Sequence, residues 1–203
     1  SQRGSFGDIA ASSFGGLVYY TSPDRSELLE QLQTKSMKEI CDTDWKDLTI
    51  ERLPEISDFT LLVGWTGQVA ITDSLIQATE KKRKVATDSD FYKEFLKKSH
   101  VVVQVLQIAW NKQDIPALQE GIRANRALLN QFAKVMQLEI ETPALQMLCD
   151  LAEQVGACAK TSGAGGGDCG ICFTQNETQR QQIETQWAKA QIQVLPLTIA
   201  EAW

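Results

Sequence analysis

Apolar and polar residues repeat with a helical period over two long segments of the chain, residues 90–112 and 115–138. The apolar positions are Phe91, Phe95, Val102, Val105, Leu106 and Ala109 in the first segment and Leu118, Ile122, Leu129, Phe132 and Met136 in the second. Stripes of this kind are typical of helices that bury one face. The pattern therefore predicts two long amphipathic helices whose apolar residues belong to a core.

Shorter segments complete the predicted layout. Further helices are expected over residues 9–14, 25–39, 72–84, 142–155 and 178–190. Runs rich in β-forming residues predict strands at 17–21, 48–53, 58–65, 170–174 and 192–197. Long helices stand next to pairs of strands, so the pattern alone predicts a mixed α/β protein of the α+β kind.

The composition changes abruptly at residues 160–170, which read Lys-Thr-Ser-Gly-Ala-Gly-Gly-Gly-Asp-Cys-Gly. Glycine reaches backbone angles closed to other residues and lets an anion approach the main chain. Successive exposed N–H groups in such a loop suit phosphate oxygens. Lys160 adds a positive charge, and Thr161 and Ser162 supply hydroxyl donors. The run favours a phosphate-binding loop over a purely structural turn.

Two known phosphate motifs do not fit this run. Gly165, Gly167 and Gly170 have the spacing of the dinucleotide fingerprint, but that motif follows a strand and opens a helix. Here the loop is expected to follow a helix and to lead into the strand at 170–174, which is the reverse order. A Walker A loop needs lysine and then serine or threonine after its last glycine, where this chain has Asp168. The run is therefore a third kind of glycine loop.

A cluster of small residues near the amino terminus contains one carboxylate, Asp8. The predicted helix over residues 9–14 is stopped by Gly15 and Gly16. Asp8 then lies at the start of this helix, where the helix dipole favours negative charge. Taken alone, the pattern favours a capping role for Asp8 over a chemical one.

Three segments taken together resemble one family. They are Gly4-Ser-Phe-Gly-Asp-Ile-Ala10, Leu62-Val-Gly-Trp-Thr-Gly67 followed by Ala70, and the glycine run at 160–170. In this order they resemble three landmarks of the bacterial phosphomevalonate kinases, a branch of the GHMP kinase superfamily. The glycine loop is the mark of the superfamily, while Asp168 and the Trp65-Thr-Gly segment narrow the resemblance to this branch.

The resemblance implies a fold and a domain order. Residues 1–55 are expected to form the end of a ribosomal-S5-like amino-terminal half, and residues 56–203 a ferredoxin-like GHMP kinase C-terminal domain. Members of the family are longer than this chain, and their glycine-serine ATP loop is not found in it. We therefore expect residue 1 not to be a natural start and the missing amino-terminal half of the same protein to complete the enzyme.

The resemblance also implies an activity and its residues. The expected reaction is ATP-dependent phosphorylation of mevalonate 5-phosphate to mevalonate 5-diphosphate, in the mevalonate route to isoprenoids, with ATP and Mg²⁺ as cofactors. Asp8 matches the catalytic aspartate of the superfamily, and Ser5, Thr72 and Lys160 are expected near the substrate. The expected phosphate loop consists of Ser162, Gly163, Ala164, Gly165, Gly166, Gly167 and Asp168.

The chemistry of the acceptor narrows the role expected for Asp8. A phosphate monoester has a second pKa near 6, so the acceptor is mostly ionised at neutral pH and hardly needs a general base. We therefore expect Asp8 to hold a lysine of the missing half or a metal ion. Arg123 and Arg126 could hold the anionic end of the acceptor, but a solvated helix face is the more conservative interpretation.

Composition excludes several other functions. The net charge of −6 argues against a general nucleic-acid surface, and no apolar run reaches the length of a membrane span. Five scattered cysteines, an odd number, suit a reducing compartment, so we expect a cytoplasmic protein. Cys169 and Cys172 have metal-knuckle spacing, but a structural role is expected for them and no protein metal site is predicted.

Two alternative functions stay open at this stage. Another small-molecule kinase of the superfamily, such as mevalonate kinase, would phosphorylate an alcohol and would need Asp8 as a base. The third hypothesis is a catalytically silent fragment or binding module that keeps the glycine loop as a turn.

Overall fold

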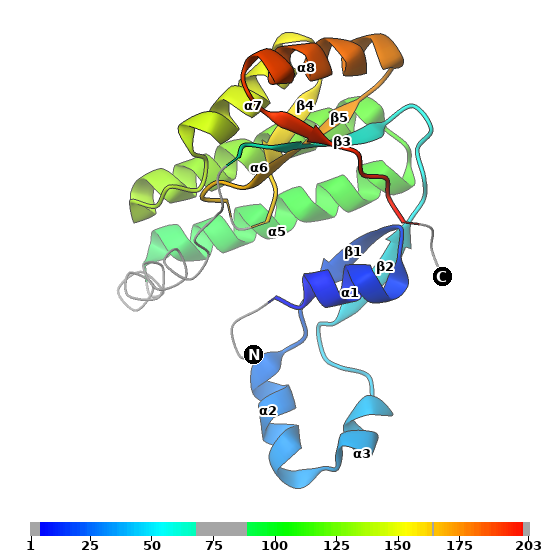
Figure 1. Cartoon of the computed structure of the whole chain (residues 1–203). Coiled ribbons are helices and arrows are strands. Elements are labelled where there is room, and N and C mark those ends of the chain that lie inside the picture. The colour runs from blue at the N-terminus through cyan, green and yellow to red at the C-terminus, as the bar shows by residue number, and fades with distance from the viewer. Residues whose placement is uncertain (1–4, 68–88, 164, 201–203) are drawn as a thin grey trace. The chain divides into compact units, whose positions relative to one another are not determined.

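The computed structural model describes residues 5–67, 89–163 and 165–200, and Figure 1 labels its helices and strands. The chain divides into two compact units, one formed by the residues up to Glu55 with Ile199 and Ala200, the other by Ile56–Thr198. The helix expected at 72–84 lies outside the described residues. The assignment of residues 1–55 and 56–203 to two domains stays a prediction.

The first unit is built around a two-stranded antiparallel ribbon. Strand β1 (Leu17–Thr21) pairs with β2 (Thr49–Leu53) so that Leu17 lies opposite Leu53. Helix α1 (Gly7–Phe14) precedes β1 and ends at Gly15, whose φ of 65° places it in the left-handed region that glycine tolerates. These elements agree with the predicted strands and with the short helix before them.

The single helix predicted over residues 25–39 is wrong, because the structure has two helices there. Helix α2 (Arg25–Thr34) stops at Lys35, whose backbone is extended, and α3 (Met37–Cys41) begins after Ser36. The Ser36 hydroxyl accepts a hydrogen bond from the Glu39 N–H, and the Glu39 carboxylate accepts one from the Ser36 N–H. This capping box stabilises a new helix start, and it outweighs the continuous helical period.

The second unit contains a four-stranded antiparallel sheet. Its strands are β3 (Thr60–Trp65), β4 (Cys158–Thr161), β5 (Cys169–Thr174) and β6 (Gln193–Leu195), in the spatial order β4-β5-β3-β6. Along the chain β3 is followed by the helices α5, α6 and α7 and then by β4, β5, α8 and β6. This is the strand–helix–strand–strand–helix–strand order of ferredoxin-like folds with additional helices before β4. The expected α+β, ferredoxin-like fold is therefore confirmed.

Four helices cover the two faces of this sheet. They are α5 (Asp90–Asn111), α6 (Ile115–Met136), α7 (Pro143–Gln154) and α8 (Glu177–Lys189). Helices α7 and α8 lie over one face, and α5 and α6 over the other (Figure 1). Side chains of the Asp, Thr and Asn types accept the cap hydrogen bonds of α6, α7 and α8, at Asp114, Thr142 and Asn176.

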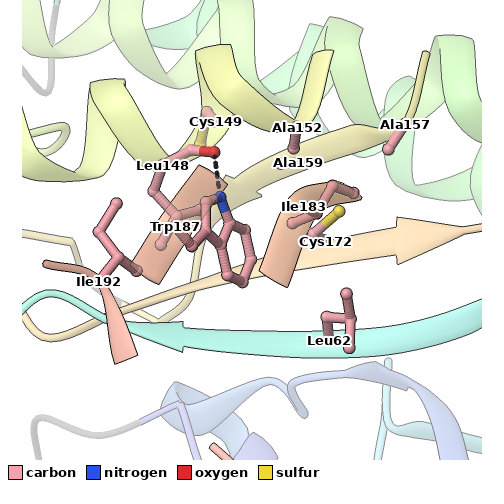
Figure 2. Close-up of a cluster of buried hydrophobic side chains, with 10 residues drawn as sticks. All are labelled: Leu62, Leu148, Cys149, Ala152, Ala157, Ala159, Cys172, Ile183, Trp187 and Ile192. Atoms are coloured by element: carbon pink, nitrogen blue, oxygen red, sulfur yellow. Dashed lines mark hydrogen bonds between the residues drawn. The ribbon is translucent and has the colours of Figure 1, made fainter. Parts of the chain in front are cut away.

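The main core lies between the sheet and helices α7 and α8 (Figure 2). Trp187 fills its centre and donates from Nε1 to the Leu148 carbonyl at 3.0 Å, so its polar group is satisfied. Gly64 and Gly170 lie opposite each other in β3 and β5, and a Cβ added to either would come within 2.8 Å of Leu148. The two glycines therefore make the depression that receives the Leu148 side chain.

Candidate functional site

The glycine run forms the loop of a β-hairpin. Strand β4 leads into it and β5 leads out, with Thr161 opposite Gly170, and the Ser162 N–H donates to the Cys169 carbonyl at 3.0 Å. The expectation that a helix precedes the loop is wrong, because the short strand β4 lies between α7 and the loop. The dinucleotide fingerprint is still excluded, since a strand and not a helix follows the loop.

The backbone of the loop takes angles that favour glycine. The values of φ are 61° at Gly163, 76° at Gly165, 85° at Gly166 and 129° at Gly167, and Asp168 continues the run at 64°. Ala164 lies outside the described residues. Among the described residues, no backbone carbonyl accepts a hydrogen bond from the N–H groups of Gly163, Gly167 or Asp168. These groups are therefore donors available to an anion such as phosphate.

One side of the loop packs against Ile140 in the connection between α6 and α7. The Gly166 N–H donates to the Ile140 carbonyl at 2.8 Å. A Cβ added at Gly165 would lie 2.7 Å from Ile140 Cγ2 and 2.9 Å from its carbonyl carbon, closer than real Cβ atoms approach. Only glycine fits at position 165, because φ is 76° there and because Ile140 occupies the place of a Cβ atom.

The end of strand β3 supports the other side of the loop. Thr66 donates from its N–H at 2.9 Å and from its hydroxyl at 3.0 Å to the Asp168 carbonyl. Two of the three segments that carry the family resemblance, separated by about 100 residues, therefore meet at one oxygen. The sequence predicted no role for Thr66, and its only signal was membership of the Trp65-Thr-Gly segment.

Asp168 is exposed and lies directly before the first residue of β5. Its Oδ1 accepts a weak hydrogen bond from the Cys169 thiol, with Sγ 3.8 Å away. Burial, with a further contribution from the Asp168 charge, raises the pKa of Cys169. This thiol stays protonated at neutral pH, so it does not repel an anion bound at the loop.

Lys160 is the second-last residue of β4, the strand that leads into the loop. Its half-buried ammonium donates to the Thr161 carbonyl at 2.8 Å. Burial lowers the pKa of Lys160 because the charged form loses hydration there. Its predicted role near the substrate stays a prediction.

The amino-terminal residues belong to the other unit and are described separately. Asp8 lies exposed in the first turn of α1, and the residue at the N-cap position is Phe6, so no side chain caps this helix. The Ser5 carbonyl accepts a hydrogen bond from the Tyr20 hydroxyl at 2.7 Å, which ties this segment to β1. Asp8 therefore makes no cap hydrogen bond, but it lies in the first turn of α1, where the helix dipole favours negative charge as the sequence predicted.

Arg126, on α6, lies at the centre of a network of charged side chains. The interpretation of Arg126 as part of a solvated face is wrong, because its side chain is 12% exposed and binds the carboxylates of Glu141, Asp150 and Glu153. Although burial opposes its charge, the hydrogen bonds that Arg126 donates to the carboxylates of Glu141 and Asp150 raise its pKa. Arg123 donates to the Ala157 carbonyl at 3.1 Å. Both arginines bind groups of the protein.

The paired cysteines of β5 differ in environment. Cys172 is buried in the main core, where burial raises the pKa of its thiol, whereas Cys169 is partly exposed. In residues 5–67, 89–163 and 165–200 no group of three His, Cys, Asp or Glu side chains is placed to hold a metal ion. Within the same ranges, no helix is long and apolar enough to cross a membrane.

These features define the class of protein. Residues 106–193 match the family described as GHMP kinases C terminal, so this part of the second unit corresponds to the C-terminal domain of that superfamily. Over 200 residues the chain is 36% identical to a phosphomevalonate kinase of Streptomyces sp. (strain CL190), a match that covers 98% of the chain and 53% of that protein. The chain therefore spans about half the length of this relative, and the predicted resemblance to phosphomevalonate kinases is confirmed.

Solved structures agree with this similarity. A Lin0012 protein from Listeria innocua superposes with a TM-score of 0.92 and 32% identity, over 98% of this chain and 56% of that one. A Streptococcus pneumoniae phosphomevalonate kinase, solved in complex with phosphomevalonate and AMPPNP, superposes with a TM-score of 0.80 and 27% identity over the same fractions. Both structures therefore share the fold of this chain over nearly its whole length.

Proposed function

We propose that this chain is part of a phosphomevalonate kinase, which transfers the γ-phosphoryl group of ATP to the phosphate of mevalonate 5-phosphate. In this reaction an oxygen of the acceptor phosphate forms the new bond to the γ-phosphorus, the bond from that phosphorus to the β-phosphate oxygen breaks, and ADP leaves. The observation that carries the proposal is the glycine hairpin loop, in a chain 36% identical to a phosphomevalonate kinase over 98% of its length.

The loop would act by binding phosphate oxygens. Phosphoryl transfer needs little covalent work from the protein, so catalysis depends on positioning and on charge stabilisation. The N–H groups of Gly163, Gly167 and Asp168 donate to no backbone carbonyl among the described residues, and Gly163 and Asp168 are exposed. In this proposal Ser162 adds a hydroxyl donor at the start of the loop, and Ala164 belongs to the same phosphate-binding segment.

The remaining roles follow the family resemblance. Asp8 is proposed as the catalytic aspartate with a positioning role, because an ionised phosphate acceptor needs no strong base. Ser5 and Lys160 are proposed near the substrate. Thr72, proposed with them, lies outside the described residues.

The residues present fit a Mg²⁺ ion that arrives with ATP. Mg²⁺ in kinases is held by one or two carboxylates together with the substrate phosphates, so a dedicated cage of side chains is not required. The carboxylate of Asp168, exposed at the end of the glycine loop, is of the right chemistry. When bound, the ion would neutralise part of the charge on the phosphates.

A steady-state assay with two acceptors tests the proposal. The full-length protein that carries this chain is supplied with ATP and Mg²⁺, and ADP release is measured with mevalonate 5-phosphate and, separately, with mevalonate. We expect release with the phosphate alone. Release with mevalonate alone would indicate the alcohol kinase of the same superfamily, and no release with either would favour a silent module.

A further inference from the structure

One side of the glycine loop rests on the connection between α6 and α7. Ile140, in this connection, accepts the Gly166 N–H and fills the space beside Gly165. The contact uses a backbone carbonyl, so the position of the loop depends on where the backbone of residue 140 is held. Whatever fixes this backbone also fixes one side of the loop.

The next residue, Glu141, is held by buried charged hydrogen bonds. Its Oε2 accepts from Arg126 Nε at 3.0 Å and from Asn130 Nδ2 at 2.8 Å, and its Oε1 accepts from Arg126 Nε at 3.2 Å and from Nη2. The Glu141 side chain is 6% exposed and that of Arg126 is 12% exposed. A bidentate pair of this kind, largely shielded from water, fixes geometry as well as charge.

The residue after Glu141 is anchored as well. Thr142 is buried and caps α7, where its hydroxyl accepts the Leu145 N–H at 3.3 Å. Three consecutive residues are therefore tied to different elements: Ile140 to the loop, Glu141 to α6 and Thr142 to α7. Because the carbonyl carbon of Ile140 is bonded to the Glu141 nitrogen, a displacement of the Glu141 backbone also displaces the Ile140 carbonyl that holds the loop.

We infer that Arg126 and Glu141 are positioning residues that set the shape of the phosphate loop through the Ile140 carbonyl. The inference rests on the proposed function, because it assigns the loop to phosphate binding. Arg126 and Glu141 touch neither substrate in this inference, and they act through the backbone of residues 140, 165 and 166.

The other carboxylates of the network provide a matched control. Asp150 and Glu153 also bind Arg126, but they come from α7 and are 47% and 34% exposed. Neither is adjacent in sequence to Ile140. Asp150→Asn removes one carboxylate charge beside Arg126, as Glu141→Gln does, but it leaves Glu141 and its bond to Ile140 unchanged.

The Glu141→Gln variant is the sharper perturbation. Both oxygens of Glu141 accept hydrogen bonds, and an amide offers only one acceptor, so its NH₂ group must face a donor of Arg126 or Asn130. Arg126 keeps the carboxylates of Asp150 and Glu153, so its buried charge stays compensated. Asn130→Ala, which removes a single hydrogen bond to Glu141, is a milder second variant.

Amide hydrogen exchange of the full-length protein tests the inference without any turnover. In Glu141→Gln we expect the Gly166 amide to exchange about tenfold faster or more, while the amides of the β3–β5 ladder keep their protection. Asn130→Ala should give a smaller effect in the same direction, and Asp150→Asn none. Unchanged exchange at Gly166 in a folded Glu141→Gln protein, or equal effects of Glu141→Gln and Asp150→Asn, would overturn the inference.

Kinetics separate positioning from a loss of folded protein. Because a displaced loop binds nucleotide phosphates less well, Glu141→Gln should raise KM for ATP about tenfold or more. In Asp150→Asn we expect KM for ATP to keep the value of the unmodified protein. A fall in kcat with an unchanged KM would contradict the inference. If the unmodified protein turns over neither acceptor, the proposed function fails, whereas the exchange of Gly166 still decides whether Glu141 holds the loop.

Discussion

Thr66 donates two hydrogen bonds to one oxygen, the carbonyl of Asp168, through its N–H at 2.9 Å and its hydroxyl at 3.0 Å. The contact joins the end of β3 to the last residue of the glycine loop. On its opposite side the loop is held by Ile140. The loop is therefore supported from two segments distant in sequence, and its shape depends on both.

Thr66→Val tests the support from β3. The variant keeps the shape of the side chain and the backbone hydrogen bond but loses the hydroxyl donor. We expect the free energy of unfolding to fall by about 1 kcal/mol, as for a typical hydrogen bond, and KM for ATP to rise. Chemical denaturation and steady-state kinetics measure the two effects. Thr66→Ser restores the hydroxyl and should recover both; a Thr66→Ser protein as impaired as Thr66→Val would refute this role.

Gly165→Ala and Gly163→Ala form a matched pair within the loop. Both residues have φ in the left-handed region, 76° and 61°, so both variants share a cost of about 1 kcal/mol in backbone strain. At Gly163 nothing lies within 4 Å of the new Cβ, whereas at Gly165 the new Cβ meets Ile140. We expect Gly165→Ala to lower the melting temperature and kcat/KM clearly more than Gly163→Ala. Equal losses in the two variants would show that the Ile140 contact does not shape the loop.

Asp8→Ala tests the proposed catalytic aspartate. Because Asp8 is exposed and caps no helix, we expect the free energy of unfolding to change by no more than about 0.5 kcal/mol. Loss of a positioning group should lower kcat by about 10²-fold, measured as ADP release by the full-length protein. Unchanged kcat would remove Asp8 from the mechanism.

The burial of Lys160 predicts a dependence of stability on pH. Its pKa in the folded protein is lowered from the ordinary value of 10.5, so the unfolded chain binds the proton more tightly. The contribution of Lys160 to the free energy of unfolding is therefore lowest at pH values below its pKa in the folded protein. It rises with pH until the pH passes 10.5, the ordinary pKa of the side chain. Lys160→Met should be more stable than the unmodified protein at neutral pH, with the difference shrinking toward alkaline pH.

Denaturation of the two proteins over a pH series measures this difference and cancels the titration of other groups. A constant difference at all pH values would contradict the assignment of the effect to the lysine charge. The activity of Lys160→Met then tests its predicted role near the substrate. A stabilised protein with reduced kcat/KM is the expected result, because a residue kept at an energetic cost is typical of functional sites.

The sequence predicted much of the fold from periodicity. The long apolar stripes of α5 and α6 and the strands β1, β3 and β5 were recovered because each segment has a regular period and a clear cap or glycine end. Strand β4 was missed because four residues, Cys158–Thr161, are too short to show alternation against the preceding helix. The break at Ser36 was missed because the local capping box competes with an otherwise continuous helical pattern.

For the site, the sequence indicated the glycine loop but not what holds it. The run of glycines and its two polar ends are local features, and local composition predicts them. The support from Ile140 uses a backbone carbonyl, which no residue type reveals, and the hydroxyl of Thr66 reaches a backbone carbonyl about 100 residues away in sequence. Arg126 was misassigned for a related reason, since three of its partners lie between 15 and 27 residues away in sequence.

The identity of the phosphorylated atom is the most direct test of the proposed function. We would incubate the full-length protein with ATP, Mg²⁺ and mevalonate 5-phosphate and follow the products by ³¹P NMR. The proposal predicts that the monoester signal of the acceptor is replaced by two coupled diphosphate signals as ADP appears. A second monoester signal, which reports phosphorylation of a hydroxyl group, or inorganic phosphate alone, would contradict it.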